Sequence, residues 1–341
     1  MNKFNFKIMR IAGLVLLILS LVACQEKTQP QVYSGLALGT DYQLQFFSKD
    51  TLDIQPQIDS IFDELNQSMS TYIEDSDISR LNAGDTTVKV DHLFRNMFLR
   101  SKEIYKNTNG YFDPTVGDIV NLYGLGSKKL NVKADSSSVD SLMVYVGFDK
   151  VSITDDNLIV RKYPQTVLDF NGIAKGYGVD LLGELLEGKG VENYLAEIGG
   201  EIRTKGKNLK SGKTWRLGID DPRTDTNPGE LQGIVELKNQ SLATSGNYRK
   251  FQYDSISGEK YVHIIDPKSG YTIKGNMLSV SVIADDCATA DAYATAFMAM
   301  DVEEAKEIAQ NQNEVDVYFI YDEVGDMKTY LSSGFERAMI D

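Results

Sequence analysis

Apolar residues recur along the chain with two periods, one typical of helices and one typical of strands. Spacings of three and four residues predict helices over 54–69, 91–107, 173–188, 288–300 and 302–309. Alternation and short apolar runs predict strands over 33–47, 192–203, 215–219, 234–237, 278–283 and 315–321, with a hairpin over 249–265. Because these elements do not alternate regularly, they favour an α+β fold, with mixed or antiparallel sheets flanked by helices, over a doubly wound sheet.

The stretch over 167–180, VLDFNGIAKGYGVD, is the most informative part of the chain. Val167–Phe170 predicts the end of a buried strand, and Asn171-Gly172 predicts a turn. The apolar spacing becomes helical from Ile173, and Gly188 and Gly190 predict where this helix stops.

Three residues in the first turns of this predicted helix are unusual for that position. Gly176 and Gly178 each cost about 1 kcal/mol relative to alanine inside a helix, and Lys175 lies at the helix end that disfavours a cation. A bound anion would explain all three, since free amides at a helix N-terminus bind phosphate and glycine permits close approach. Packing glycines with a solvated lysine are the alternative.

The N-terminus has the features of an export signal. Basic residues precede an apolar run over 11–21 that is too short to span a membrane as a helix. Leu21-Val22-Ala23-Cys24 then resembles the lipobox of bacterial lipoproteins, in which the cysteine is acylated. An ordinary cleaved signal with a chance cysteine is the alternative.

These features predict three segments. We expect a lipoprotein signal peptide over 1–23, a lipidated Cys24 with a polar tether over 24–32, and one folded domain over 33–341. The protein would then be an exported bacterial lipoprotein, anchored to a membrane and facing the periplasm. With Cys24 acylated, Cys287 has no partner for an internal disulfide.

Charge and residue counts exclude several classes of function. The net charge of −14 argues against a nucleic-acid partner. Two cysteines and two histidines are too few for a Cys/His zinc site. An acidic protein that binds a polyphosphate needs a mediating cation, and a divalent metal is the natural choice.

Some local features allow simple structural interpretations. His92, in the first turn of the helix capped by Asp91, is expected at the surface, and residues 125–138 are expected to form an exposed loop. Asp113-Pro114 predicts a turn that aims a carboxylate, and Gly199-Gly200 predicts a bulge or a close backbone approach.

Several motifs occur together in an order that is far more specific than any one of them. They are Leu38-Gly39-Thr40, Met69-Ser70-Thr71-Tyr72, Gly110-Tyr111-Phe112-Asp113-Pro114-Thr115, Leu168-Asp169 with Ala174-Lys175-Gly176-Tyr177, Glu197-Ile198-Gly199-Gly200, Ala243-Thr244-Ser245-Gly246, His263-Ile264-Ile265-Asp266-Pro267, and Asp291 with Thr295. On these motifs the sequence resembles the ApbE family, the FAD:protein FMN transferases, from about Tyr33 to about Ala338.

The resemblance implies a reaction and a site. FAD would be split at its pyrophosphate, AMP would leave, and FMN would join a Ser or Thr hydroxyl of an exported acceptor protein. FAD would lie in a cleft between two lobes. The residues implied to line it are Leu38, Tyr72, Tyr111, Phe112, Asp113, Asp169, Lys175 and Ile265, and the implied Mg²⁺ ligands are the Gly172 carbonyl, Asp291 and Thr295. Leu38, Tyr111 and Asn247 depart from the residues common in the family at those positions.

The residues suit this chemistry on physical grounds. Carboxylate, hydroxyl and carbonyl oxygens are the ligands Mg²⁺ prefers, and Lys175 is placed to neutralise a phosphate oxygen. The acceptor hydroxyl needs a base, for which His263 is the candidate. Asp266 either orients His263 or only forms an Asp-Pro turn, and a satisfied strand-end histidine is the alternative for His263.

Two other functions remain open from the sequence. A metal-dependent FAD pyrophosphatase would give FMN and AMP with water in place of the acceptor. A non-catalytic FAD-binding lipoprotein would need neither a metal nor a base, so the combination of His263, Asp291 and Thr295 argues against it.

Overall fold

The structure is a computed structural model that describes residues 28–128, 130, 132–223, 231–246, 251–253, 260–262, 264–273 and 275–340. For residues 251–253 and 260–262 it describes the backbone alone.

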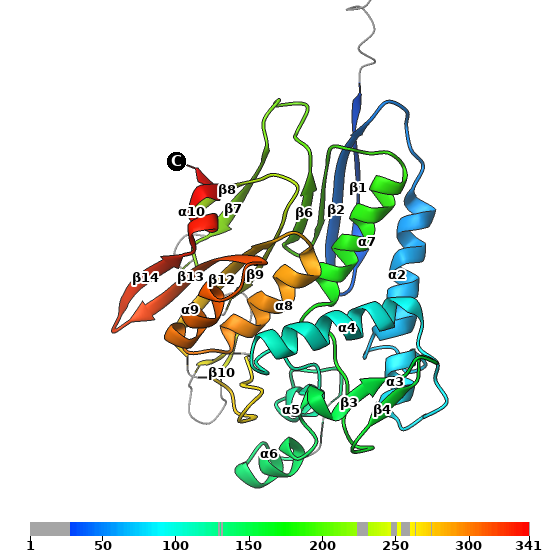
Figure 1. The fold of residues 1–341 in the computed structure, drawn as a ribbon, viewed down its shortest axis with the longest axis vertical. Coiled ribbons are helices and arrows are strands. Elements are labelled where there is room, and N and C mark those ends of the chain that lie inside the picture. The colour runs from blue at the N-terminus through cyan, green and yellow to red at the C-terminus, as the bar shows by residue number, and fades with distance from the viewer. Residues whose placement is uncertain are drawn as a thin grey trace, which may run out of the picture.

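An eight-stranded sheet in the order β1-β2-β5-β6-β9-β12-β13-β14 runs through the molecule, from β1 at one side to β14 at the other (Figure 1). All its described strand pairs are antiparallel. The strands are β1 (Gln29–Ala37), β2 (Thr40–Ser48), β5 (Tyr194–Ile198), β6 (Glu201–Lys205), β9 (Ser241–Gly246), β12 (Met277–Ala284), β13 (Val315–Glu323) and β14 (Asp326–Leu331).

Among the described residues, three smaller antiparallel sheets accompany the large one. They are β15-β8-β7, β3-β4 and β10-β11. Their strands are β3 (Val151–Ile153), β4 (Ile159–Arg161), β7 (Trp215–Asp220), β8 (Leu231–Leu237), β10 (Phe251–Tyr253), β11 (Lys260–Val262) and β15 (Met339–Ile340).

The helices begin close to where the polar caps in the sequence predict. Asp91 caps its helix by accepting a hydrogen bond from the Phe94 N–H at 2.8 Å, and His92 is exposed, as predicted. The helices are α2 (Gln55–Met69), α3 (Asp77–Asn82), α4 (His92–Asn107), α5 (Gly117–Leu122), α6 (Ser136–Met143), α7 (Ala174–Gly188), α8 (Cys287–Met298), α9 (Val302–Gln310) and α10 (Ser333–Ala338), with a 3-10 turn, η1, at Phe148–Lys150. In the part of the chain that the structure describes, no helix is both long and apolar enough to cross a membrane.

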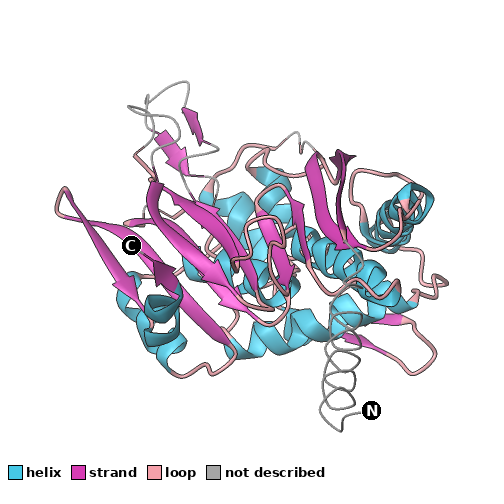
Figure 2. Ribbon diagram, turned by 90° about the horizontal axis from the view of Figure 1, so that it is seen from above, coloured by secondary structure: helices cyan, strands magenta, loops and turns pink. Residues whose placement is uncertain are grey.

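The large sheet separates two apolar layers, and alternation along its strands fills both. In β5, Tyr194 and Ala196 pack on the side of α2 and α7, whereas Leu195 packs on the opposite side. The small sheet β15-β8-β7 and α10 cover that opposite side, through residues such as Trp215 and Phe335. Figure 2 shows helices lying along one face of the strands. The α+β fold with antiparallel sheets is therefore confirmed; its division into two lobes stays a prediction.

The first turns of α7 and α8 pack unusually closely. A Cβ atom at Gly176 would overlap the backbone carbonyl of Cys287 and lie 2.8 Å from the Cβ atom of Asp291. α8 is rich in alanine, and all but one of its residues are buried. The packing alternative for Gly176 is thus correct, and it brings the start of α7 against the face of α8 that carries Asp291.

The predicted strand end at Val167–Phe170 is wrong, because these residues join no sheet. Both backbone groups of Leu168 instead pair with the side-chain amide of Asn82: the Leu168 N–H donates at 2.9 Å and the Leu168 carbonyl accepts at 2.8 Å. The Asp169 N–H donates to the Pro114 carbonyl at 2.7 Å. The Asn82 side chain and the Pro114 carbonyl thus form the hydrogen bonds that a neighbouring strand would form in a sheet.

The single strand predicted over 192–203 is also wrong, since the chain reverses within it. Gly199 and Gly200 adopt φ values of +60° and +102° and form a two-residue turn that joins β5 to β6. The predicted exposed loop over 125–138 is correct only in part, because α6 begins at Ser136. The strands β9, β14 and β15 and the helices α5 and α10 were not predicted.

Gly176→Ala is expected to lower the free energy of unfolding by about 1–3 kcal/mol, because the new methyl group would overlap the Cys287 carbonyl between two packed helices. Gly188→Ala, in the last turn of the same helix, is the matched control. Nothing lies within 4 Å of its Cβ position, so this change should raise stability by up to about 1 kcal/mol. Chemical denaturation measures both, and equal effects would contradict the packing described.

Candidate active site

Three oxygen-bearing residues predicted as metal ligands meet where α7 begins. The Thr295 hydroxyl donates to the Gly172 carbonyl with 3.3 Å between the oxygens. Asp291, one helical turn before Thr295 on α8, is 4% exposed and accepts a hydrogen bond from the Gly176 N–H at 2.9 Å. The turn before α7 and the helix α8 therefore bring these three residues together, although more than a hundred residues separate Gly172 from Asp291 and Thr295 in the sequence.

These groups fit a small divalent cation. Octahedral Mg²⁺ with ligands at about 2.0–2.1 Å needs neighbouring oxygens roughly 3 Å apart, close to the observed separation of the Gly172 and Thr295 oxygens. A Cβ atom at Gly172 would lie 3.1 Å from the Thr295 methyl group and 3.4 Å from the Phe112 ring. Glycine therefore keeps the space beside its own carbonyl open.

Lys175, in the first turn of α7, is paired with a residue that the sequence analysis missed. Its Nζ lies 2.5 Å from Oε1 of Glu201, which begins β6 directly after the Gly199-Gly200 turn and is 3% exposed. Burial lowers the pKa of Lys175, but the charges of Asp291 and Glu201 outweigh burial and hold this pKa above its ordinary value. Lys175 is therefore a cation at neutral pH.

Burial also shifts the two carboxyl groups. It raises the pKa of Glu201, and the charge of Asp291 adds to this effect while Lys175 opposes it. It raises the pKa of Asp291 as well, against the opposing effects of Lys175 and of the Gly176 N–H. A divalent cation bound at Asp291 would remove this penalty by compensating the buried negative charge.

A further buried carboxylate, Asp180, ties α7 to the start of α8. Its oxygens accept hydrogen bonds from the Cys287 N–H at 2.9 Å and the Ala288 N–H at 2.8 Å, which satisfies two free donors of α8. Arg203 of β6 pairs with Asp180 at 2.9 Å. Burial raises the pKa of Asp180 to about 6, although the two N–H groups and Arg203 oppose this shift. Asp180 lies five residues after Lys175, at the end of the stretch over 167–180, and no other feature of the sequence indicated it.

Two of the residues implied to line the FAD site lie near each other. Tyr72 is 67% exposed, and its pKa is raised by partial burial and then by the charge of Asp169. Asp169 lines a polar pocket together with Thr71, Asn82 and Asp118. The Thr71 hydroxyl is buried there without a hydrogen-bond partner among the described residues.

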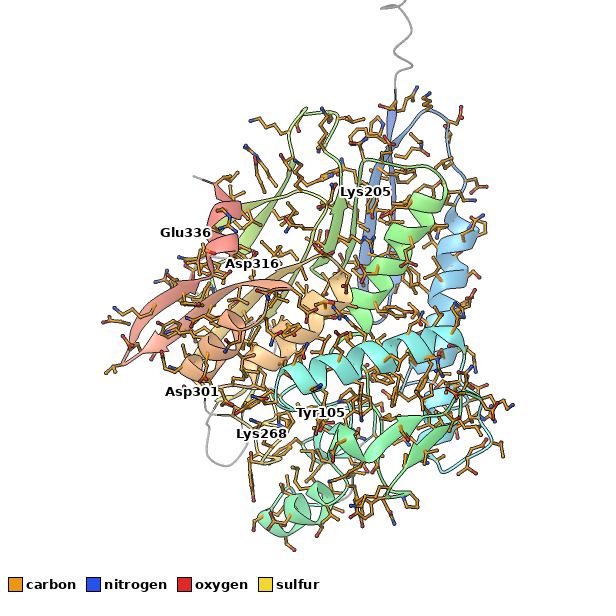
Figure 3. All side chains as sticks on the ribbon, viewed as in Figure 1. Tyr105, Lys205, Lys268, Asp301, Asp316 and Glu336 are labelled. Carbon is orange, nitrogen blue, oxygen red and sulfur yellow. The ribbon has the colours of Figure 1, made fainter. Side chains whose placement is uncertain are left out.

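Tyr111 and Phe112, at the start of the motif from Tyr111 to Thr115, contact different parts of the structure. The Tyr111 hydroxyl donates to Glu304 at 2.6 Å, and the Lys268 ammonium lies 3.6 Å from the centre of the Tyr111 ring; Figure 3 labels Lys268. Phe112 is buried beside Gly172.

The Asp113 carboxylate accepts hydrogen bonds from the N–H and the hydroxyl of Thr115 and from the Phe148 N–H. Oδ1 of Asp113 thus stabilises its own turn, and Oδ2 ties this turn to the 3-10 turn η1. Burial raises the pKa of Asp113 to about 6.

The motif from His263 to Pro267 is described only in part. His263 and Asn247 lie outside the described residues. Ile265 is buried against Ile119 and Val146. The Asp266 carboxylate accepts from the Lys268 N–H at 2.9 Å and from the Ser269 hydroxyl at 2.6 Å, so it stabilises a turn, while its predicted relation to His263 stays a prediction.

Leu38 belongs to the same end of the molecule as Lys175. With φ at +50°, it forms the two-residue turn between β1 and β2, and its side chain lies 3.2 Å from the Cβ position of Gly178. The Gly199 N–H donates to the Asp41 carbonyl at 3.0 Å. The two hairpin turns therefore lie beside the first turns of α7.

The site residues thus form one close group and several separate ones. Gly172, Lys175, Asp291 and Thr295 lie together, with Phe112 and Leu38 beside them. A helix N-terminus that carries a lysine and faces hard oxygen ligands is the kind of site that binds a phosphorylated ligand with a divalent cation. The fold and site therefore define an α+β protein equipped for phosphate chemistry.

The comparisons with known proteins agree with the motifs. The model of the ApbE family matches residues 38–319, and the chain belongs to this family. It is 34% identical over 335 residues to the FAD:protein FMN transferase of Haemophilus influenzae, covering 95% of each chain. It is 34% identical to the FAD:protein FMN transferase of Vibrio cholerae over 326 residues, covering 94% of this chain and 96% of that one.

Solved structures confirm the fold. The flavin transferase ApbE from Vibrio cholerae superposes with a TM-score of 0.82 at 33% identity, covering 92% of this chain and 100% of that chain. The apbe protein from Thermotoga maritima gives a TM-score of 0.78 at 26% identity, with the same coverage.

Between pH 4 and pH 7, the free energy of unfolding is expected to fall less steeply with rising pH in Asp180→Asn than in the wild type. The folded-state pKa of Asp180 is about 6 against an ordinary 3.8, so the folded protein binds this proton more tightly than the unfolded chain. The contribution of Asp180 is therefore complete below about pH 3.8 and is lost as pH rises through about 6. The excess stability of the wild type over the variant should shrink from pH 4 to pH 7, as measured by denaturant unfolding.

Glu187→Gln is the control, because the pKa of Glu187 is lowered in the folded protein whereas that of Asp180 is raised. Burial raises the pKa of Glu187, but hydrogen bonds from Lys205 and Tyr194 outweigh burial and lower it. Its contribution is therefore present above the unfolded-state pKa and is lost as pH falls. A wild-type excess over Asp180→Asn that grows from pH 4 to pH 7 would contradict the assignment.

Proposed function

We propose that the protein transfers FMN from FAD to a Ser or Thr hydroxyl of an exported acceptor protein, with release of AMP, in a magnesium-dependent reaction. Family membership supports the activity, because the curated relatives are named FAD:protein FMN transferase. The observation that carries the proposal is the meeting of Gly172, Asp291 and Thr295 with Lys175 at the start of α7.

The reaction exchanges the phosphoanhydride bond of FAD for a phosphoester bond to the acceptor. The acceptor hydroxyl oxygen forms a bond to the phosphorus of the FMN half, the bond from that phosphorus to the bridging pyrophosphate oxygen breaks, and AMP carries the bridging oxygen away. Mg²⁺, held by the oxygens of Gly172, Asp291 and Thr295, would stabilise the negative charge that develops on the phosphates. Lys175 would neutralise a phosphate oxygen, and the amides of the first turn of α7 would favour the anion.

Proton transfer and flavin binding need further residues. His263 is proposed to take the proton of the acceptor hydroxyl, since its ordinary pKa is close to neutrality. Tyr72 and Asp169, which lie near each other, are proposed to bind the flavin nucleotide, with Leu38, Phe112 and Ile265 as apolar walls. Tyr111 and Asp113 are proposed to act through the loop that they stabilise.

We propose the anchor and the location from the N-terminal sequence, of which residues 1–27 lie outside the described part of the chain. The tether is shorter than the predicted 24–32, because Gln29–Val32 belong to β1 and pair with β2. Acylation of Cys24 would anchor the protein to a membrane, and the residues between Cys24 and β1 would let the domain reach an exported acceptor.

The proposed activity is tested by mixing the protein that begins after Cys24 with FAD, Mg²⁺ and exported flavoproteins of the same cell, and then weighing the proteins by intact mass spectrometry. We expect an acceptor heavier by one FMN, and release of AMP. Removal of Mg²⁺ with EDTA, or Asp291→Ala, should abolish both, because the buried oxygen ligand is lost. AMP and free FMN without an adduct would indicate hydrolysis, and FAD that is bound but intact would indicate a carrier.

His263→Ala is expected to lower the rate of transfer by about 100-fold or more, because general-base catalysis contributes about 10²–10⁴-fold. FAD affinity, measured by equilibrium dialysis, should stay close to that of the wild type, since the imidazole acts on the acceptor hydroxyl. His92→Ala is the matched control, as His92 is exposed in the first turn of α4, and it should change neither quantity. Equal losses of FAD binding and of transfer in His263→Ala would rule out the role as base.

A further inference from the structure

Two buried carboxylates lie around one lysine at the start of α7. The Lys175 ammonium is in direct contact with Glu201, at 2.5 Å, and is also stabilised by the charge of Asp291. The Asp291 carboxylate instead accepts a hydrogen bond from the Gly176 N–H at 2.9 Å. Lys175 is thus paired with Glu201, which is not a predicted cation ligand, and not with Asp291, which is one.

The fold fixes Glu201 in this position. The Gly199-Gly200 turn reverses the chain immediately before it, and β6 then presents alternate residues to α7. Every second residue of β6 forms an ion pair with α7: Glu201 with Lys175 at 2.5 Å, Arg203 with Asp180 at 2.9 Å, and Lys205 with Glu187 at 2.8 Å. Figure 3 labels Lys205. The pair at the site has the opposite polarity to the other two, with its cation on the helix and its anion on the strand.

Stability alone does not account for an acid at this position. Glu201 is 3% exposed, and its second oxygen, Oε2, is buried without a hydrogen-bond partner among the described residues. A buried ion pair adds little net stability, and a buried acceptor left unpaired is destabilising. The acid is better explained by its effect on Lys175.

We propose that Glu201 is a positioning residue that holds the Lys175 ammonium away from Asp291 and so keeps the Asp291 carboxylate available to the divalent cation. This inference rests on the cation dependence in the proposed function. Lys175 and Mg²⁺ are both attracted to Asp291, and both cannot contact the same buried oxygen. Glu201 resolves this competition by giving Lys175 a carboxylate of its own.

Without the charge of Glu201, the strongest remaining attraction on Lys175 is Asp291. The ammonium would then pair with Asp291, and the cation would have to displace it in order to bind. Loss of Glu201 should therefore weaken cation binding through Lys175, and removal of Lys175 as well should restore it.

The test measures Mg²⁺ binding to the purified protein by isothermal titration calorimetry in the absence of FAD, so that no turnover is involved. Glu201→Gln keeps the size of the side chain, and it should weaken Mg²⁺ binding by about 10-fold or more, the range found when groups that orient metal ligands are changed. The double variant Lys175→Met with Glu201→Gln should bind Mg²⁺ nearly as tightly as the wild type. Lys175→Met alone should bind Mg²⁺ as tightly as the double variant, because Glu201 acts on the cation only through Lys175.

Lys205→Gln is the matched control, since it breaks an ion pair between the same strand and helix away from the site, and its Mg²⁺ affinity should be unchanged. Thermal unfolding of each variant shows that it is folded. Should Glu201→Gln alone not fold, the comparison of Lys175→Met with the double variant still tests the inference, because a difference between them would show that Glu201 acts on the cation directly.

Each outcome bears on the inference. Equal Mg²⁺ affinity of the wild type and Glu201→Gln would overturn it and leave the proposed function intact. A double variant as weak as Glu201→Gln would also overturn it, because Glu201 would then act on the cation directly. A wild type that does not bind Mg²⁺ would overturn the cation dependence of the proposed function, and this inference with it.

Discussion

The close approach of α7 and α8 at Gly176 is the constraint on which the rest of the site depends. A side chain at Gly176 would separate the helices, and Asp291 would lose its hydrogen bond from the Gly176 N–H. The same approach lets Asp180 reach the first amides of α8 and brings Thr295 to the Gly172 carbonyl. One position without a side chain therefore sets the geometry of the candidate cation ligands.

Buried charge, more than apolar contact, determines which residues meet at this junction. Asp180, Asp291 and Glu201 are all buried, and burial raises the pKa of each. Their partners, Lys175 and Arg203, come from α7 and β6. Ion pairs of this kind contribute little to net stability, but a mismatched pairing would leave a charge buried alone, which is strongly destabilising. The charges thus favour one alignment of β6 against α7.

Periodicity predicted most of the elements, because the alternation along β5 and the helical spacing of α2, α4 and α7 reflect real buried faces. It failed where a side chain or a single turn decides the backbone. The run at Val167–Phe170 is apolar and extended, but Asn82 supplies the hydrogen bonds that a strand would have supplied. Glu201 was missed because its partner, Lys175, lies 26 positions earlier in the numbering, and no local spacing relates the two. The motifs identified the candidate cation ligands, whereas the contacts of Asp113 and Asp266 needed the structure.

The pairing of Gly176 with Asp291 spans 115 residues, and that of Thr295 with Gly172 spans 123. Contacts this distant along the chain form slowly, because loop closure costs entropy before the contact stabilises anything. Synthesis proceeds from the N-terminus, so Gly172 and Lys175 emerge from the ribosome long before α8. A nascent or truncated chain that ends before residue 291 therefore contains the helix start and Gly172 but lacks Asp291 and Thr295. The site can therefore be completed only after α8 has been synthesised.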